Sequence, residues 1–313
     1  MFCVKQTWIF ENDCLLTHLS VRIRDTIHFW RDFMSITVSA KWTHEKMSDS
    51  NTDFVLFDTR FNLSEPNSGL ESFNEEHIVG AHYLDLNKDL SSEVQTHGGS
   101  HPLPEPEKFA MKVGAEGVGN DTIVVVYDDG NGMFAARAWW VFYYMGHEHV
   151  YVLEDGLKGW KEAGYETTDT LTDPTPRTFT PHVRVGEIAH MEEVKEKTSK
   201  KEAVLIDSRA GDRYLGNVEP MYAKSGHIPG AKNFFWQDVL NEDGTWKEDH
   251  LLEDHFRDFD KNEEIIVSCG SGVSACPNII GLKKAGFTNV KLYPGSFSDW
   301  ISYNENEVET KEE

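Results

Sequence analysis

The sequence predicts an α/β protein built from two tandem domains, each a mainly parallel β-sheet flanked by helices. Two observations carry this prediction: an internal repeat that covers most of the chain, and strand-like runs followed by helix-like runs in each copy. A chain of 313 residues has the length of about two domains. Strand-then-helix order is typical of parallel sheets, in which the helix returns the chain to the next strand.

The repeat is visible as blocks that match in the same order. Phe54–Arg60 matches Ala203–Arg209 at an offset of 149 residues, and Glu76–Ala81 matches Gly226–Ala231 at an offset of 150. Single residues also match, in the pairs Gly146 and Gly286, Val150 and Val290, Trp160 and Trp300. The first copy carries about nine additional residues around Ser91–Leu103. We interpret the pattern as a gene duplication.

Each copy pairs an apolar, β-branched run with a helical run. The runs Ile123–Tyr127 and Ile265–Ser268 predict strands covered on both faces. Helices are predicted over Met133–Tyr144 and Ala275–Ala285, and the glycine that follows each one is expected to end it.

Changes in composition predict the domain boundaries. Pro174, Pro176 and Pro181 exclude a regular helix between the copies, so we expect a surface linker there. The first residues balance four acids against four bases and lack an apolar signal core. We interpret them as a variable extension, with a targeting segment as the alternative. The predicted segments are an N-terminal extension at 1–35, a first domain at 36–166, a linker at 167–182, a second domain at 183–303 and an acidic tail at 304–313.

The charge balance and cysteine content restrict partners and compartment. A formal net charge of −23 argues against nucleic acid as a partner, because phosphates are repelled. No apolar run is long enough to span a membrane. Four cysteines do not make a disulfide scaffold and are typical of a reducing compartment. We therefore expect a cytoplasmic protein, with the mitochondrion as the alternative.

A candidate nucleophile follows the matched strand Ile265–Ser268 of the second copy. Cys269 opens the loop Cys269–Ala275, which contains two glycines and leads into a predicted helix. Such a loop can point several N–H groups at one place, and the helix N-terminus adds positive potential there. Both effects favour a thiolate, so we predict Cys269 as a nucleophile. The first copy has Asp128 at this position, and we expect only one domain to be chemically competent.

Cys276 is interpreted mainly as a packing residue, with a redox partner as the alternative.

Over residues 36–303 the sequence resembles the two-domain sulfurtransferases of the rhodanese family. The resemblance rests on Cys269–Ala275, Asp207–Arg209, Gly226–Ala231, and Gly295-Ser296 with Trp300. It implies two rhodanese-like domains, of which the second is catalytic. It also implies a loop cysteine that takes sulfur from a donor, carries it as a persulfide and passes it to an acceptor, without a metal or organic cofactor. The acceptor would be a thiol such as thioredoxin, or cyanide.

The loop residues favour one kind of donor. Family members that use thiosulfate place Arg and Lys directly after the cysteine, whereas this chain has Gly270 and Ser271. That pattern resembles the members that use 3-mercaptopyruvate, in which this serine forms a proton relay with a histidine and an aspartate of the first domain. By resemblance the histidine is His101. The aspartate position falls near Asn87, which cannot stabilise an imidazolium by charge. Two alternatives follow: proton transfer is weaker here, or Asp85 or Asp89 substitutes.

The resemblance also implies residues that bind the donor. Arg213 matches an arginine that binds the substrate carboxylate, a task that suits a bidentate guanidinium. A second arginine of the family is replaced here by Met221. The remaining expected substrate-binding residues belong to the cysteine loop: Gly270, Gly272, Val273 and Ser274.

Other residues are predicted to support the fold. Arg209 is expected to pair with Asp207, and His77 and His227 are expected to be structural because both copies have them.

Three other functions are weaker alternatives. A cysteine phosphatase would need an arginine at position 275, which is Ala275. A metal site at His147 and His149 lacks cysteines nearby in the sequence. A degenerate, non-catalytic binding paralogue would have no need of Cys269 in an intact loop. Within the family, a thiosulfate sulfurtransferase is the alternative activity.

Overall fold

The computed structural model describes residues 35–310, so the predicted extension at 1–35 lies almost wholly outside the described residues. Both repeat copies belong to one compact unit that begins at Ile36. Within residues 35–310, no helix combines the length and apolarity needed to cross a bilayer. The same part of the chain contains no group of three or more His, Cys, Asp or Glu placed to hold a metal ion.

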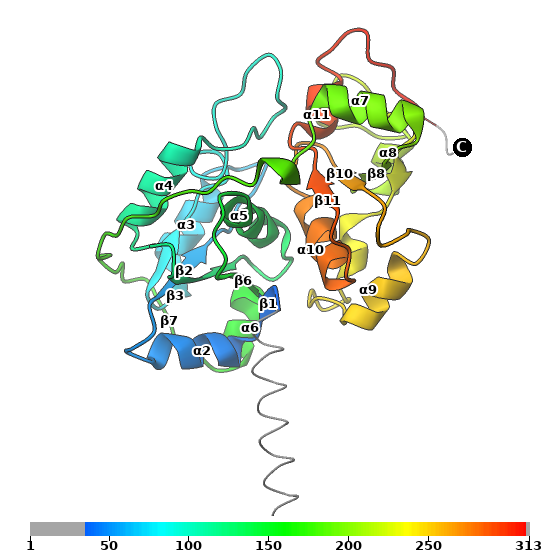
Figure 1. Cartoon of the computed structure of the whole chain (residues 1–313). Coiled ribbons are helices and arrows are strands. Elements are labelled where there is room, and N and C mark those ends of the chain that lie inside the picture. Colours follow the sequence, from blue (N-terminus) through cyan, green and yellow to red (C-terminus); the bar gives the residue numbers. More distant parts are fainter. Residues whose placement is uncertain (1–34, 311–313) are drawn as a thin grey trace, which may run out of the picture. The chain divides into compact units, whose positions relative to one another are not determined.

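The first domain is a five-stranded sheet in the order β1-β6-β5-β2-β4, with every neighbouring pair parallel (Figure 1). Its strands are β1 (Thr37–Val38), β2 (Phe54–Asp58), β4 (Ala81–Tyr83), β5 (Ile123–Tyr127) and β6 (Val150–Leu153). Its helices are α2 (Ala40–Ser48), α3 (Ser68–Glu75), α4 (Pro106–Ala115), α5 (Met133–Tyr144) and α6 (Gly156–Glu162). A separate antiparallel pair joins β3 (His77–Ile78) to β7 (Thr167–Thr168).

The second domain repeats this design with a four-stranded parallel sheet in the order β11-β10-β8-β9. Its strands are β8 (Val204–Asp207), β9 (Lys232–Asn233), β10 (Ile265–Ser268) and β11 (Val290–Leu292). Its helices are α7 (Met191–Lys200), α8 (Gly211–Tyr214), α9 (Asp249–His255), α10 (Cys276–Lys284) and α11 (Ser296–Trp300), with 3₁₀ turns η1 (Val185–Glu187) and η2 (Trp236–Val239). The fold class predicted from the sequence is confirmed.

Strand register supports the repeat residue by residue. Asp58 lies beside Tyr127 in the first sheet, and Asp207 lies beside Ser268 in the second. The residues after these strands, Asp128 and Cys269, therefore occupy equivalent places at the carboxyl edges of the two sheets. That edge is where parallel sheets place their ligands.

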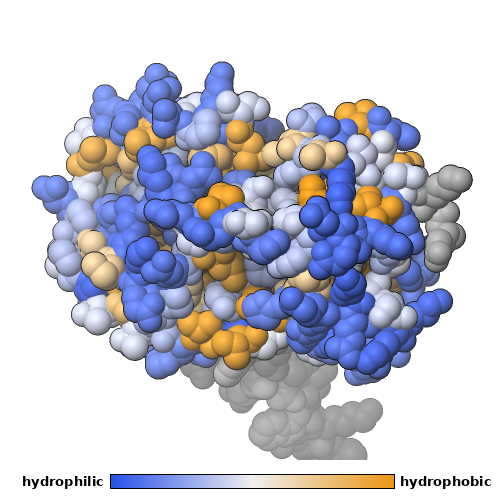
Figure 2. All heavy atoms as spheres, turned by 90° about the horizontal axis from the view of Figure 1, so that it is seen from above, coloured by the Kyte–Doolittle hydropathy of each residue, from blue (hydrophilic) through white to orange (hydrophobic). Residues whose placement is uncertain are grey.

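The apolar strands form the core, as expected of strands covered on both faces. Val124, Val125 and Val126 of β5 are fully buried, as are the three apolar residues of β10. One hydrophobic cluster runs across both domains, where α5 packs against α10. On the face shown in Figure 2, hydrophilic residues predominate and hydrophobic ones form separated patches.

The segments outside the two sheets are more closely bound than the sequence indicates. The start of the predicted linker is β7, which pairs with the first domain, and the amides of Arg177 and His182 donate to carbonyls of that domain. No helix forms between 169 and 184, as the prolines predict. The acidic C-terminal segment also pairs with the second domain, because Glu309 bridges to His227.

Candidate active site

Cys269 lies directly after β10, and its side chain is only 1% exposed. The Gly272 amide donates a hydrogen bond to Sγ at 3.1 Å, and the Ser296 hydroxyl lies 4.0 Å from the same sulfur. Backbone amides directed at a buried atom stabilise negative charge on it. The sulfur thus has one backbone amide directed at it and a serine hydroxyl nearby.

Helix α11 holds the cysteine loop in place. The amides of Phe297 and Ser298 donate to the carbonyls of Cys269 and Gly270 at 3.0 and 2.9 Å. The amide of Cys269 in turn donates to the Ser296 hydroxyl at 3.0 Å. Ser296 has a φ of +52°, which is strained for a residue with a side chain. Backbone strain of this kind clusters at functional sites because the surrounding contacts must enforce it.

The loop also depends on one glycine. Gly272 has a φ of +77°, and a Cβ there would collide with the carbonyl oxygen of Pro294. After Gly272 the chain passes through Val273, which is buried in the core, and half-buried Ser274 before α10 begins. The expected substrate-binding loop therefore presents mainly backbone groups and the Ser271 hydroxyl to a ligand.

The equivalent loop of the first domain binds a carboxylate, that of Asp128. One carboxylate oxygen of Asp128 accepts from the amides of Gly130 and Gly132, at 2.9 and 3.0 Å. The other accepts from the amides of Phe134 and Ala135, both at 3.1 Å. Four amides thus surround one anion, at the place where the second domain has its cysteine.

The sequence predicts several amides around Cys269, whereas a single one reaches Sγ among the described residues. The comparison with Asp128 gives the reason. A carboxylate oxygen stands two bonds from Cβ, but the cysteine sulfur stands only one bond from it. Amides arranged as they are around Asp128 would converge on an atom bonded to Sγ rather than on Sγ itself.

The nine-residue insertion of the first domain carries His101 to the cysteine loop. His101 Nδ1 lies 2.7 Å from Ser271 Oγ, and both side chains are buried. Burial lowers the pKa of His101 to about 4, with a further lowering from the charge of Arg137. The imidazole is therefore neutral at neutral pH, and it can exchange a proton with the Ser271 hydroxyl.

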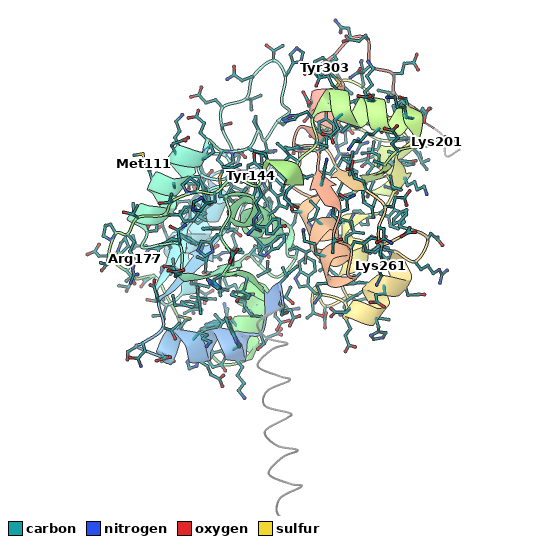
Figure 3. All side chains as sticks on the ribbon, viewed as in Figure 1. Met111, Tyr144, Arg177, Lys201, Lys261 and Tyr303 are labelled. Carbon is teal, nitrogen blue, oxygen red and sulfur yellow. The ribbon has the colours of Figure 1, made fainter. Side chains whose placement is uncertain are left out.

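The insertion is fixed to α11 by polar and aromatic contacts. The Gly98 amide donates to the Asp299 carboxylate at 2.7 Å, and the Ser100 amide donates to the Ser298 hydroxyl at 3.0 Å. His97 stacks on Tyr303, which is labelled in Figure 3, with ring centroids 4.1 Å apart. Helix α11 thus positions both the cysteine loop and the segment that carries His101.

The structure does not supply the carboxylate of the expected relay. Asn87 is exposed, and its backbone N–H donates a hydrogen bond to Asp85 Oδ1. Asp89 accepts a hydrogen bond from the Asp85 amide, so both candidate carboxylates stabilise the local turn. Within residues 35–310, the hydrogen bond of the His101 ring is the one to Ser271. Neither Asp85 nor Asp89 makes a hydrogen bond to the His101 ring in the described residues.

The resemblance implies that Arg213 binds the substrate carboxylate, but in this structure the Arg213 side chain is already paired with Glu219. Its Nε and Nη2 donate to the buried carboxylate of Glu219, at 2.8 to 3.3 Å. Nη1 has no hydrogen-bond partner within the described chain, and the side chain is 22% exposed. Arg213 therefore keeps one nitrogen for a ligand. Met221, where the family has a second arginine, is exposed and offers no charge.

The predicted structural residues do support the fold. Arg209 donates to both oxygens of Asp207 and to the carbonyl of Gly226, and Arg60 makes the equivalent contacts in the first domain. His77 and His227 are buried and each lies 2.7 Å from a backbone carbonyl.

Cys276 is fully buried in α10, with Sγ 3.4 Å from the carbonyl of Gly272. Burial raises the pKa of the Cys276 thiol to about 12. It therefore remains a protonated packing residue beneath the loop.

Arg137 is a functional residue that the sequence reasoning missed. It lies in α5 of the first domain, is fully buried, and donates to the carbonyls of Gly272, Leu90 and His101 at 3.0 to 3.1 Å. Within residues 35–310, no carboxylate is among the groups that act on its charge. Burial lowers the pKa of Arg137, and the neighbouring side chains of Cys276 and Cys269 partly oppose that effect. The sequence could have indicated this residue, because Arg137 is the one charged residue in the otherwise apolar helix α5.

Tyr222 was also missed. Its hydroxyl lies against Gly270 and Ser271 of the cysteine loop. No pattern in the sequence indicates that its side chain turns toward the loop.

Comparison with known proteins assigns this architecture to a family. A family model for the rhodanese-like domain matches residues 39–163 and again 190–303. The chain is 38% identical over 258 residues to a probable 3-mercaptopyruvate sulfurtransferase of Pseudomonas aeruginosa, covering 81% of this chain and 91% of that one. It is 32% identical over 275 residues to a thiosulfate sulfurtransferase of Cricetulus griseus, covering 84% and 91%.

Solved structures agree. SseA from Escherichia coli, described as a 3-mercaptopyruvate sulfotransferase, matches with a TM-score of 0.74 at 31% identity. The match covers 84% of this chain and 99% of SseA. The chain thus belongs to the rhodanese family and is a two-domain sulfurtransferase.

Proposed function

We propose that the protein transfers sulfur from 3-mercaptopyruvate through a Cys269 persulfide to a thiol acceptor such as thioredoxin, or to cyanide, and releases pyruvate. The observation that carries the proposal is the uncharged cysteine loop with its Ser271–His101 hydrogen bond of 2.7 Å. A donor with one carboxylate needs less positive charge than dianionic thiosulfate. A carbon leaving group needs a proton, which the serine–histidine pair can deliver.

In the first half-reaction the Cys269 thiolate attacks the thiol sulfur of the donor. The new S–S bond forms as the C–S bond breaks, and the electron pair of that bond leaves as the enolate of pyruvate. The persulfide proton moves through Ser271 and His101 to the enolate carbon. This leaves pyruvate and a persulfide anion. Neutral His101 suits this exchange because it need not hold a full positive charge.

The persulfide anion is the species that the loop backbone would stabilise. Its outer sulfur stands two bonds from Cβ, as the carboxylate oxygens of Asp128 do in the first domain, where four amides converge on them. In the second half-reaction the acceptor thiolate or cyanide attacks that outer sulfur and the Cys269 thiolate leaves. No step requires a metal or an organic cofactor.

The donor would bind with its carboxylate toward Nη1 of Arg213, the nitrogen not engaged by Glu219. The four loop residues Gly270, Gly272, Val273 and Ser274 would surround the reacting sulfur.

Steady-state kinetics with two donors test the proposal. The full chain is assayed with 3-mercaptopyruvate and with thiosulfate, using cyanide as the acceptor in both cases. We expect kcat/KM for mercaptopyruvate to exceed that for thiosulfate by about tenfold or more, which corresponds to about 1.4 kcal/mol of transition-state stabilisation. A preference for thiosulfate would assign the thiosulfate activity instead. No turnover with either donor would indicate a degenerate binding paralogue.

A further inference from the structure

Tyr222 lies over the catalytic loop, at a position that the mechanism above does not use. A Cβ placed on Gly270 would stand 2.9 Å from the Tyr222 hydroxyl and 3.2 Å from its ring. The tyrosine thus covers the residue that directly follows Cys269. A side chain at position 270 would force the Tyr222 hydroxyl to move, so the tyrosine in this position fits the bare backbone of Gly270.

The surroundings of Tyr222 place its hydroxyl among the groups proposed to handle the donor. On one side the Arg213 guanidinium lies 5.6 Å from the centre of the ring. On the other side the hydroxyls of Ser271 and Ser100 lie close to the Tyr222 hydroxyl. Phe297 packs edge-on at 6.1 Å and limits the movement of the ring. The Tyr222 ring therefore lies near the proposed carboxylate ligand, and its hydroxyl lies near the proposed proton relay.

Tyr222 is also kept in its neutral form. Burial raises its pKa, and negative charge on Cys269 raises it further, whereas the nearby Ser271 hydroxyl lowers it less. At neutral pH the group is thus an uncharged O–H donor. An uncharged donor can bind one carboxylate or carbonyl oxygen, but it does little to neutralise a second negative charge.

We propose that Tyr222 is the donor-selecting residue of this enzyme: its hydroxyl donates to the carboxylate or carbonyl oxygen of a thiol-bearing α-keto acid. A side chain at position 270, cationic or not, would displace the hydroxyl from this position. The inference rests on the proposed function, and it explains how the site can work with an exposed methionine at position 221. The organic donor is held by one arginine nitrogen and one neutral hydroxyl.

The test compares the specificity ratio, which is kcat/KM for mercaptopyruvate divided by kcat/KM for thiosulfate, with cyanide as the acceptor. We expect Tyr222→Phe to lower this ratio by about tenfold, because a hydrogen bond to a charged group is lost while the ring stays. The control is Tyr165→Phe, a tyrosine of the first domain that packs on Trp160, and its ratio should equal that of the wild type.

Tyr222→Ala separates selection from shielding. If the ring only shields the thiol, Tyr222→Ala would change the rates with both donors alike, and Tyr222→Phe would leave the ratio unchanged. That result would overturn the proposal. It would leave the proposed function intact as long as the wild type still prefers mercaptopyruvate, so the two failures are distinguishable.

A double substitution tests the contact with Gly270. Gly270→Ala should lower kcat/KM for mercaptopyruvate in the wild type, because the new methyl group displaces the hydroxyl. In the Tyr222→Phe background the same change should cost at least threefold less, since the atom nearest to the methyl group is gone. Equal costs in both backgrounds would contradict the contact on which the inference depends.

Discussion

Asp128 and Cys269 occupy the same place in the two halves of the molecule, each directly after the central strand of its sheet and at the start of a loop that leads into a helix. In the first half the loop amides bind a carboxylate that is part of the fold. In the second half one loop amide, that of Gly272, donates to the sulfur of Cys269. The same backbone design thus holds a carboxylate in one domain and a cysteine in the other.

The Asp128 carboxylate should contribute strongly to stability. Asp128→Ala leaves four amides without their acceptor, and we expect it to lower the free energy of unfolding by about 3 kcal/mol. Asp128→Asn keeps one acceptor oxygen but turns an NH2 donor toward the other two amides, so it should also destabilise the protein, though less than Asp128→Ala. Urea unfolding of the three proteins measures both changes. Equal stability of wild type and Asp128→Ala would show that the amides do not depend on the anion.

Two buried histidines should make stability depend on pH. Burial lowers the pKa of His101 and of His147 to about 4, against an unfolded value of 6.5. Between these values the unfolded chain binds more protons, so stability is complete above pH 6.5 and falls as the pH drops toward 4. In this range each histidine should make the free energy of unfolding rise with pH by up to about 1.4 kcal/mol per pH unit. In denaturant titrations His147→Gln should reduce the slope, whereas replacing exposed His250 should not.

The arginine beneath the loop should support reactivity as well as packing. Arg137→Met leaves three carbonyls without their donor and removes a buried positive charge near Cys269. We expect alkylation of Cys269 by iodoacetamide at neutral pH to slow by about tenfold, because a thiolate loses that charge. Arg137→Lys keeps the charge but not the planar fork, so alkylation should slow less while stability still falls. Unchanged alkylation in both variants would limit Arg137 to a structural role.

Arg213 should affect donor binding more than turnover. Arg213→Ala removes the proposed carboxylate ligand, and we expect KM for mercaptopyruvate to rise by about tenfold or more with a smaller change in kcat. Glu219 keeps Arg209 as a partner, so the local fold should survive. The control is the second half-reaction alone, in which cyanide takes sulfur from preformed Cys269 persulfide. Its rate should not change in Arg213→Ala. A fall in kcat alone would place Arg213 outside the binding step.

The fold was predictable from the sequence because the same order of strand-like and helix-like runs occurs in both copies of the repeat. The apolar runs after residues 122 and 264 gave strands, and Met133–Tyr144 formed the helix that its pattern predicts. The catalytic loop was equally accessible, since Cys269 and its glycines are neighbours in the chain.

Contacts between distant segments were not predictable in the same way. Glu219 reaches Arg213 and Tyr222 reaches Gly270 from a segment without regular structure, so no periodicity reveals them. Asp85 and Asp89 likewise form hydrogen bonds within their own turn and none to the His101 ring, which their positions in the sequence do not reveal. Side-chain hydrogen bonds to nearby backbone compete with long-range ones, and one sequence alone does not show which prevails.

The most direct test of the account is mass spectrometry of the full chain after brief incubation with 3-mercaptopyruvate in the absence of an acceptor. We expect the wild type to gain the mass of one sulfur atom on the peptide that contains Cys269, and to lose it on addition of cyanide. Cys276→Ala should gain the same sulfur, whereas Cys269→Ser should gain none. A Cys269→Ser protein that still carries the sulfur, or a wild type that never acquires it, would contradict the central claim.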